Sequence, residues 1–145
     1  NFGDPALTRL TGLFRQQVCE EVARSDLPGL IFTYVWALDG QGDKAHVDEF
    51  TDIFRTQGAE IYYVELRSSQ STRLKRNKTE NRLMHKPSKR NLKGSEAHLL
   101  EADETYIFNS SRAHPFYYQE NSIIVDNDAL SADEAAQAII EAFGW

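Results

Sequence analysis

The side chains best suited to chemistry stand in one basic segment, residues 73–94, whose sequence is RLKRNKTENRLMHKPSKRNLKG. Its nine Lys and Arg and its single acid, Glu80, give a formal charge of +8, which leaves −14 for the rest of a chain whose net charge is −6. Arg and Lys donate several hydrogen bonds to small, highly charged anions such as phosphates. The basic segment is therefore a candidate phosphate-binding site, and the alternative that charge alone leaves open is a solvated loop.

The basic segment also contains residues that suit a mobile lid. Pro87 offers a hinge, and the apolar side chains of Leu83 and Met84 could seat the segment against the protein. Arginines that close over a polyphosphate neutralise the charge that develops on a transferring phosphoryl group. This combination favours a lid over a simple solvated loop.

Other catalytic patterns are missing from the sequence. The histidines at positions 46, 85, 98 and 114 lie far apart and show no metal-ligand spacing, so we expect no metal site built from protein ligands. Neither a G-x-S-x-G nucleophile motif nor a G-x-x-x-x-G-K-[ST] phosphate loop occurs in residues 1–145. The single cysteine, Cys19, excludes an internal disulfide and is typical of a small core residue.

Candidate substrate contacts follow the apolar run LIFTYVWAL, residues 30–38. Tyr34 and Trp36 lie within the run and could contact a ligand, although a central strand more often buries such side chains in the core. Asp39 follows the run and could bind a hydrated Mg²⁺ ion or a substrate hydroxyl. It is equally typical of a turn residue before GQG.

The elements that must position these residues alternate along the chain. Apolar, β-branched runs predict strands at 30–38, 59–66 and 121–127, and helical spacing of apolar residues predicts helices at 4–25, 43–58, 68–77, 95–109 and from 131 to 143. This order predicts an α/β fold in which helices cover a parallel sheet. Ligands in such sheets bind at the carboxyl ends of the strands, and the basic segment follows the second of these ends.

Helix-end signals support these boundaries. Asp4 and Pro5 are typical of an N-cap and a first helical residue, and Ser131 with Glu134 matches a capping box. Ser95 is our predicted N-cap for the helix at 95–109.

Length and composition set the class of protein. A chain of 145 residues with 41% hydrophobic content is sufficient for one domain, residues 1–145. No apolar run reaches the roughly 20 residues of a membrane span and no signal pattern is present, so we expect a cytoplasmic protein that does not bind membranes. The acidic net charge argues against general nucleic-acid binding.

Four segments together resemble the P-loop small-molecule kinases, specifically the bacterial group labelled shikimate-kinase-like or AAA-domain ATPases. These are SDLPGLIFTYVWALD, GAEIYYVEL, RLKRNKTENRLMHKPSKRN and VDNDALSADEAAQAI. The resemblance covers nearly the whole chain, and RNKTENRLMHKPSKRN, which matches the lid of the group, is its most specific part. It implies an ATP-dependent phosphotransferase with ATP and Mg²⁺ as cofactors and an unknown small-molecule acceptor.

The resemblance also implies roles for individual residues. Arg76, with Arg73 as its competitor, would pack on the adenine, and Asn127 and Asp128 would line the base. The phosphates would be reached by the lid cations, which we define as Arg82, Lys86, Lys89 and Arg90. Of these, Arg82 and Arg90 are the catalytic candidates.

The sequence departs from the P-loop pattern at its start. The group begins with a strand, a phosphate-binding loop and a helix, and residues 1–145 match none of these. In that fold the first strand lies between the strands that correspond to 30–38 and 59–66. We therefore expect this first strand to be absent from residues 1–145, together with the phosphate loop. We also expect little or no phosphotransfer by this chain alone, because those groups position the phosphates.

Two other classes of function remain open. One is a non-catalytic nucleotide-binding or anion-binding module, which as a homo-oligomer could bury its exposed sheet edges. The other, with weaker support, is a protein whose basic segment contacts RNA.

Overall fold

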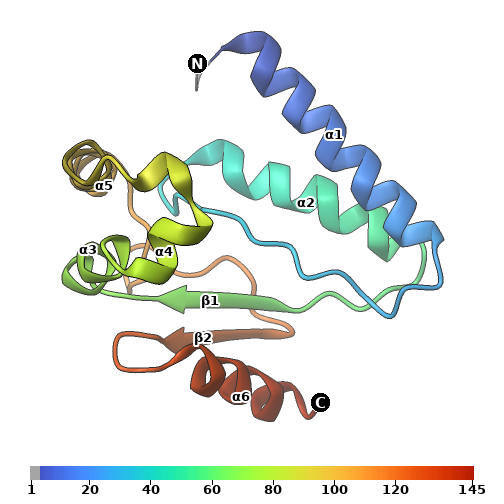
Figure 1. The fold of residues 1–145 in the computed structure, drawn as a ribbon. Helices are drawn as coiled ribbons and strands as arrows, with labels where there is room; N and C mark the ends of the chain where they lie inside the picture. The colour runs from blue at the N-terminus through green and yellow to red at the C-terminus, as the bar shows by residue number, and fades with distance from the viewer. Residues whose placement is uncertain (1–3) are drawn as a thin grey trace. The chain divides into compact units, whose positions relative to one another are not determined.

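The computed structural model describes residues 4–145 and contains helices and strands in mixed order (Figure 1). The elements are α1 (Pro5–Arg24), α2 (Gln41–Arg55), β1 (Tyr63–Arg67), α3 (Gln70–Asn77), α4 (Glu80–His85), the 3-10 helix η1 (Pro87–Lys89), α5 (Leu92–Thr105), β2 (Ser122–Asp126) and α6 (Ala132–Phe143). They form two compact units. The first comprises the residues up to 35 and residues 41–61, and the second comprises residues 36–40 and 62–145.

The first unit consists of α1, α2 and the extended chain that joins them. The Asp4 carboxylate accepts hydrogen bonds from the backbone N–H groups of Ala6 and Leu7, so the predicted N-cap of α1 is confirmed. Cys19 is buried, with 2% of its surface exposed, as expected for a core residue. The ring of Phe32 packs 5.2 Å from that of Phe50, which fixes the extended chain against α2.

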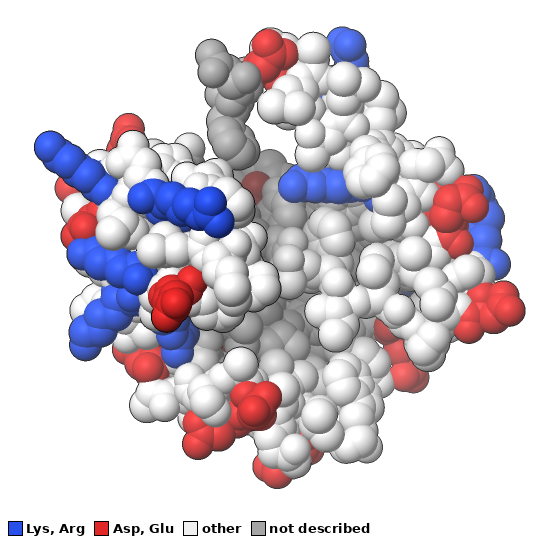
Figure 2. All heavy atoms as spheres, viewed as in Figure 1, with Lys and Arg blue, Asp and Glu red and all other residues white. Residues whose placement is uncertain are grey.

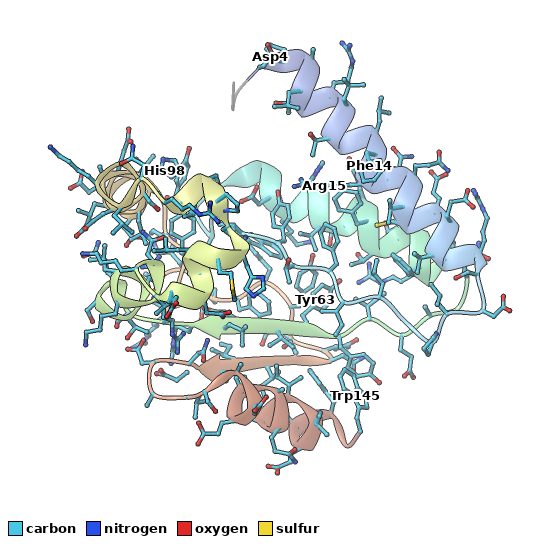
Figure 3. The ribbon with its side chains drawn as sticks, viewed as in Figure 1. Asp4, Phe14, Arg15, Tyr63, His98 and Trp145 are labelled. Carbon is cyan, nitrogen blue, oxygen red and sulfur yellow. The ribbon has the colours of Figure 1, made fainter. Side chains whose placement is uncertain are left out.

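The apolar residues of α1 are less buried than the helical pattern suggests. Leu10 and Phe14 keep 58% and 71% of their surface exposed. Figure 3 shows Phe14 beside Arg15 on α1. The helix is confirmed, but the described residues cover only part of its apolar stripe.

The second unit is built on a two-stranded parallel sheet. β1 and β2 pair in register from Tyr63 opposite Ser122 to Arg67 opposite Asp126. The connection between them contains α3, α4, η1 and α5, and α6 packs against β2 (Figure 1). The predicted α/β class, a parallel sheet flanked by helices, is thus confirmed, while the P-loop kinase form of that fold stays a prediction. The strands predicted at 59–66 and 121–127 are both present, but the first begins later than predicted and runs from Tyr63 to Arg67.

The strand predicted at 30–38 is wrong. The segment is extended but joins no sheet among the described residues, and Ile31 and Val35 expose 93% and 78% of their surface. At the end of the segment, Leu38 donates its backbone N–H to the carbonyl of Ile107 at 2.7 Å, but Ile107 belongs to no strand. An apolar, β-branched run becomes a strand only when a neighbouring backbone supplies a regular row of partners.

Aromatic side chains fill much of the second unit. Trp36 lies against Phe116, Tyr117 and Tyr118, with ring centroids 5.5–6.0 Å apart. Tyr118 in turn stacks on Tyr63 at the start of β1 at 3.5 Å. This cluster ties residues 36–40 to the sheet.

The C-terminal helix, α6, packs against β2 in the second unit. Its capping box is confirmed, because Ser131 Oγ accepts from Glu134 N–H and Glu134 Oε2 accepts from Ser131 N–H, at 3.2 and 2.7 Å. Gly144 ends α6 with φ of 72°, a conformation that favours glycine. Trp145, labelled in Figure 3, then packs its ring 4.9 Å from that of Tyr62.

The predicted start of the helix at Ser95 is also wrong. α5 begins at Leu92, and the N-cap is Asn91, whose side chain accepts a hydrogen bond from Gly94 N–H at 3.1 Å. Ser95 lies inside the helix and is buried. Its hydroxyl has a partner on another helix, Asn77, which no local pattern could indicate.

Over residues 4–145, none of the helices has both the length and the apolar character needed to cross a membrane.

Candidate functional site

The carboxyl ends of β1 and β2 bring together residues that lie about sixty positions apart. Asn127, which follows β2, donates its backbone N–H to the carbonyl of Arg67, the last residue of β1. The loop after β2 therefore lies beside the turn from β1 into α3. In a parallel sheet this is the rim where ligands bind.

Arg76 crosses from α3 to the loop after β2. Its Nη2 donates to the carbonyls of Asn127 at 2.6 Å and Leu130 at 3.2 Å. Both contacts are made by one nitrogen at the edge of the guanidinium, a group whose planar faces can stack on a ring. The structure thus brings together Arg76 and Asn127, two of the residues predicted to bind a nucleotide base.

Asp128 is the third member of this group. Its Oδ1 accepts the backbone N–H of Ser69 at 2.7 Å, at the N-cap of α3. The pKa of the Asp128 carboxyl is lowered, first by the backbone hydrogen bond from Ser69, then by the Ser69 hydroxyl and, more weakly, by Thr72 and Arg76. The carboxylate therefore stays charged and fixes the loop after β2 to the start of α3.

The lid cations lie on α4, η1 and the residues that follow them. Thr79 caps α4 by accepting Arg82 N–H, and Arg90 Nε donates to the carbonyl of Leu83 at 3.1 Å, which folds η1 back on α4. No ion pair engages any lid cation within residues 4–145. Figure 2 shows Lys and Arg side chains gathered over the region of α3, α4 and α5. Within these residues no carboxylate therefore neutralises the lid cations, and Arg82 Nε is buried without a hydrogen-bond partner.

Two side-chain contacts between the end of α3 and the first turns of α5 hold the two ends of the lid stretch together. Asn77 and Ser95 are 4% and 7% exposed. Asn77 Nδ2 donates to Ser95 Oγ at 3.0 Å, and Ser95 Oγ donates to Asn77 Oδ1 at 3.1 Å. Next to them, Lys78 Nζ lies 2.8 Å from Glu96 Oε2. Both ends of the stretch that carries α4 and η1 are thereby fixed to each other.

Arg73 lies apart from this group, because its side chain turns to the end of α5. Its Nη1 contacts Asp103 Oδ1 at 2.6 Å, and its guanidinium carbon lies 5.8 Å from the centre of the Phe108 ring. Asp103 and Phe108 could not be predicted from the sequence, because partners thirty residues away carry no local signal. Arg73 and Asp103 line a pocket of about 300 Å³ with residues 106–109 and Gln70.

The predicted substrate contacts are divided between the two units. Tyr34, in the first unit, donates its hydroxyl to Asp43 Oδ1 at 3.0 Å, and its pKa is raised to about 12 by burial and then by Asp43. Trp36 is part of the aromatic cluster of the second unit. Asp39 accepts the backbone N–H of Ile107 at 3.0 Å and so anchors the turn after residue 38.

The described residues offer limited ligands for a metal ion. Among residues 4–145, no group of three or more His, Cys, Asp or Glu side chains could hold one. In nucleotide sites, however, Mg²⁺ takes one or two carboxylates and completes its shell with phosphates and water. The residues present therefore fit a Mg²⁺ ion only if a nucleotide supplies most of its ligands.

Comparison with protein families, with curated proteins and with solved structures gives no match for this chain. The resemblance to P-loop kinases therefore stays a prediction, and a function can be inferred only from the geometry of the site.

Proposed function

We propose that this chain binds ATP at the carboxyl ends of β1 and β2 in the manner of the ATP-dependent small-molecule phosphotransferases, although residues 1–145, which contain no phosphate loop, would transfer little or no phosphoryl group by themselves. The observation that best supports the proposal is the contact of Arg76 with the loop after β2. The lid cations follow Arg76 in the chain, and within residues 4–145 none of them forms an ion pair. ATP would supply the phosphoryl group. The acceptor is a small molecule of unknown identity.

The base would stack on Arg76. A guanidinium fixed by two carbonyls has lost most of its freedom before a ligand arrives, so stacking costs little further ordering. The hydrogen bond between Asp128 and Ser69 keeps the loop beside it in place. This preorganisation supports the choice of Arg76 over Arg73, whose guanidinium is engaged with Asp103.

The phosphates would be bound by the lid cations. The basic segment brings positive charge to a chain that is otherwise strongly acidic, so an anion gains most by binding there. Arg82 and Arg90 would face the charge that develops during transfer, and Lys86 and Lys89 would hold the phosphate oxygens. Closure of the segment would exclude water from the reaction.

A non-catalytic anion-binding module is the second candidate. It is favoured by one observation: among residues 4–145 the lid cations form no ion pair, and binding an anion requires nothing beyond these charges. Such a module would bind the phosphates and ignore the base.

Titration calorimetry with three probes separates the two candidates. We expect MgATP to bind the full chain more tightly than the magnesium complex of tripolyphosphate, by about twofold to thirtyfold, because a cation–π contact of the base with Arg76 adds roughly 0.5–2 kcal/mol. Equal affinities for the two would favour the anion-binding module. Adenosine bound as tightly as MgATP, or no binding of MgATP at all, would contradict a phosphate site in the basic segment.

A further inference from the structure

A shallow, open pocket lies in the same unit, apart from the Arg76 group and with different chemistry. The pocket of about 300 Å³ is walled by Gln70 and Arg73 from α3, by Asp103 from the end of α5 and by residues 106–109. This volume is at the lower end of the range for ligand sites, which runs from about 300 to 1,000 Å³. It suits a small molecule.

The ion pair in the pocket wall is incompletely bonded. Arg73 and Asp103 make one contact, at 2.6 Å, although guanidinium and carboxylate can form two. Arg73 Nε and Asp103 Oδ2 are both buried without a hydrogen-bond partner, and they are two of only five such side-chain atoms in residues 4–145. The Asp103 side chain is 8% exposed, so bulk water does not satisfy it.

A ligand that satisfies this pair must both donate and accept hydrogen bonds. Carboxylate oxygens only accept and guanidinium nitrogens only donate, whereas a hydroxyl group does both. Two adjacent hydroxyls therefore match an Arg and an Asp that lie side by side, once their side chains rotate to admit the ligand. The charges of the pair offset each other, so the ligand has no need of a net charge.

Apolar groups complete the pocket. Phe108 lies under the Arg73 guanidinium, and Tyr106 and Ile107 contribute further apolar surface. Such a wall suits the C–H face of a ring. Asp39 holds Ile107 by its backbone N–H, so this wall is fixed to the turn after residue 38.

We infer that this pocket is a binding site for a small, neutral ring molecule with adjacent hydroxyl groups, held by Asp103 and Arg73 against Phe108 and Tyr106. The site goes beyond the proposed nucleotide binding and does not rest on it. Its chemistry is neutral and hydroxyl-directed, whereas the lid cations require an anion.

The test uses myo-inositol as the probe and the full, isotopically labelled chain. We expect myo-inositol to shift the backbone amide signals of residues 106–109 in a saturable titration. Asp103→Asn should weaken its binding by about tenfold, the loss expected for one charge-assisted hydrogen bond. Cyclohexanol, a ring without adjacent hydroxyls, should not produce the saturable shifts.

Glu104→Gln is the matched control, because it removes the same charge from the neighbouring, exposed position of α5. Tyr106→Ala, at a half-exposed pocket residue, gives a second variant that should weaken binding even if Asp103→Asn does not fold. Unchanged MgATP affinity in Asp103→Asn is expected, which keeps this test separate from the nucleotide proposal. Shifts confined to other residues, equal binding by Asp103→Asn and Glu104→Gln, or no saturable shift with myo-inositol would each overturn the inference.

Discussion

Single side chains, more than whole elements, define the rim at which β1 and β2 end. Arg76 and Asp128 cross between the turn into α3 and the loop after β2, each by a hydrogen bond of 2.6 or 2.7 Å to backbone. Arg73, one helical turn earlier, serves a different pocket. Two arginines that look interchangeable in the sequence therefore have different partners and different expected effects when replaced.

Replacing Arg76 should loosen the loop after β2. Arg76→Met leaves the carbonyls of Asn127 and Leu130 without their donor, so we expect the free energy of unfolding to fall by about 1–3 kcal/mol. Chemical denaturation measures this change. Lys75→Met is the matched control at the adjacent exposed position, and an equal loss in both variants would show that the two carbonyl contacts contribute nothing.

Tyr34 gives a prediction about pH. Its pKa is raised from 10.0 to about 12 in the folded chain, mainly by burial and also by the bond to Asp43, so folding favours the neutral phenol. The stability that this shift contributes is complete below pH 10 and is lost as the pH rises from 10 towards 12, because the unfolded chain ionises first.

Denaturation of the wild type and of Tyr34→Phe across this range checks the sign. The wild type should lose stability relative to Tyr34→Phe above pH 10, and absorbance should show one tyrosine ionising near pH 12. A difference between the two proteins that is constant with pH would refute the assignment.

At the scale of elements, the link between α3 and α5 controls the basic segment. Asn77 and Ser95 satisfy each other in a buried setting, so removing either leaves a buried polar group unpaired. We expect Asn77→Ala and Ser95→Ala each to cost about 1–3 kcal/mol of stability. The double variant should cost less than the sum, with a coupling of roughly 0.5–3 kcal/mol.

A double-mutant cycle by chemical denaturation measures this coupling. Hydrogen exchange on the same variants should show faster exchange in residues 78–94 than in β1, because the ends of the lid stretch are no longer fixed to each other. Strictly additive losses would mean that Asn77 and Ser95 are not the link.

The elements that could be predicted from the sequence are those whose signals are local. Asp4 and the Ser131–Glu134 pair mark helix starts through contacts within three residues, and Asp4 and Ser131 are the N-caps of α1 and α6 in the structure. The strand at 30–38 failed because pairing depends on a neighbouring backbone, which an apolar run cannot reveal. Ser95 was misread as a cap because its partner, Asn77, lies eighteen residues away.

The candidate site divides in the same way. The concentration of positive charge was visible in the sequence, and so was the position of the basic segment after a strand. The resemblance implied that Arg76, Asn127 and Asp128 surround the same base, but the direct contact of Arg76 with the loop after β2 was not predicted. The pocket of Arg73 and Asp103 was not foreseen, because the ion pair joins helices separated by the whole basic segment.

At the scale of the molecule, charge is the property that most constrains function. The chain has a net charge of −6, yet its basic segment carries nine Lys and Arg with one acid. None of the lid cations forms an ion pair within the part of the chain that the structure describes. Keeping like charges together without counter-ions is unfavourable, and a bound polyphosphate would relieve it.

The most direct test is the affinity of the chain for MgATP with and without Arg82. We predict saturable binding by the wild type and binding about tenfold weaker in Arg82→Ala, because one charge-assisted contact to phosphate is lost. Arg9→Ala, which removes an exposed arginine from α1, should bind like the wild type. Circular dichroism on each variant checks that the fold is retained. A folded Arg82→Ala variant that binds MgATP as tightly as Arg9→Ala would contradict the proposal that the basic segment is a phosphate lid.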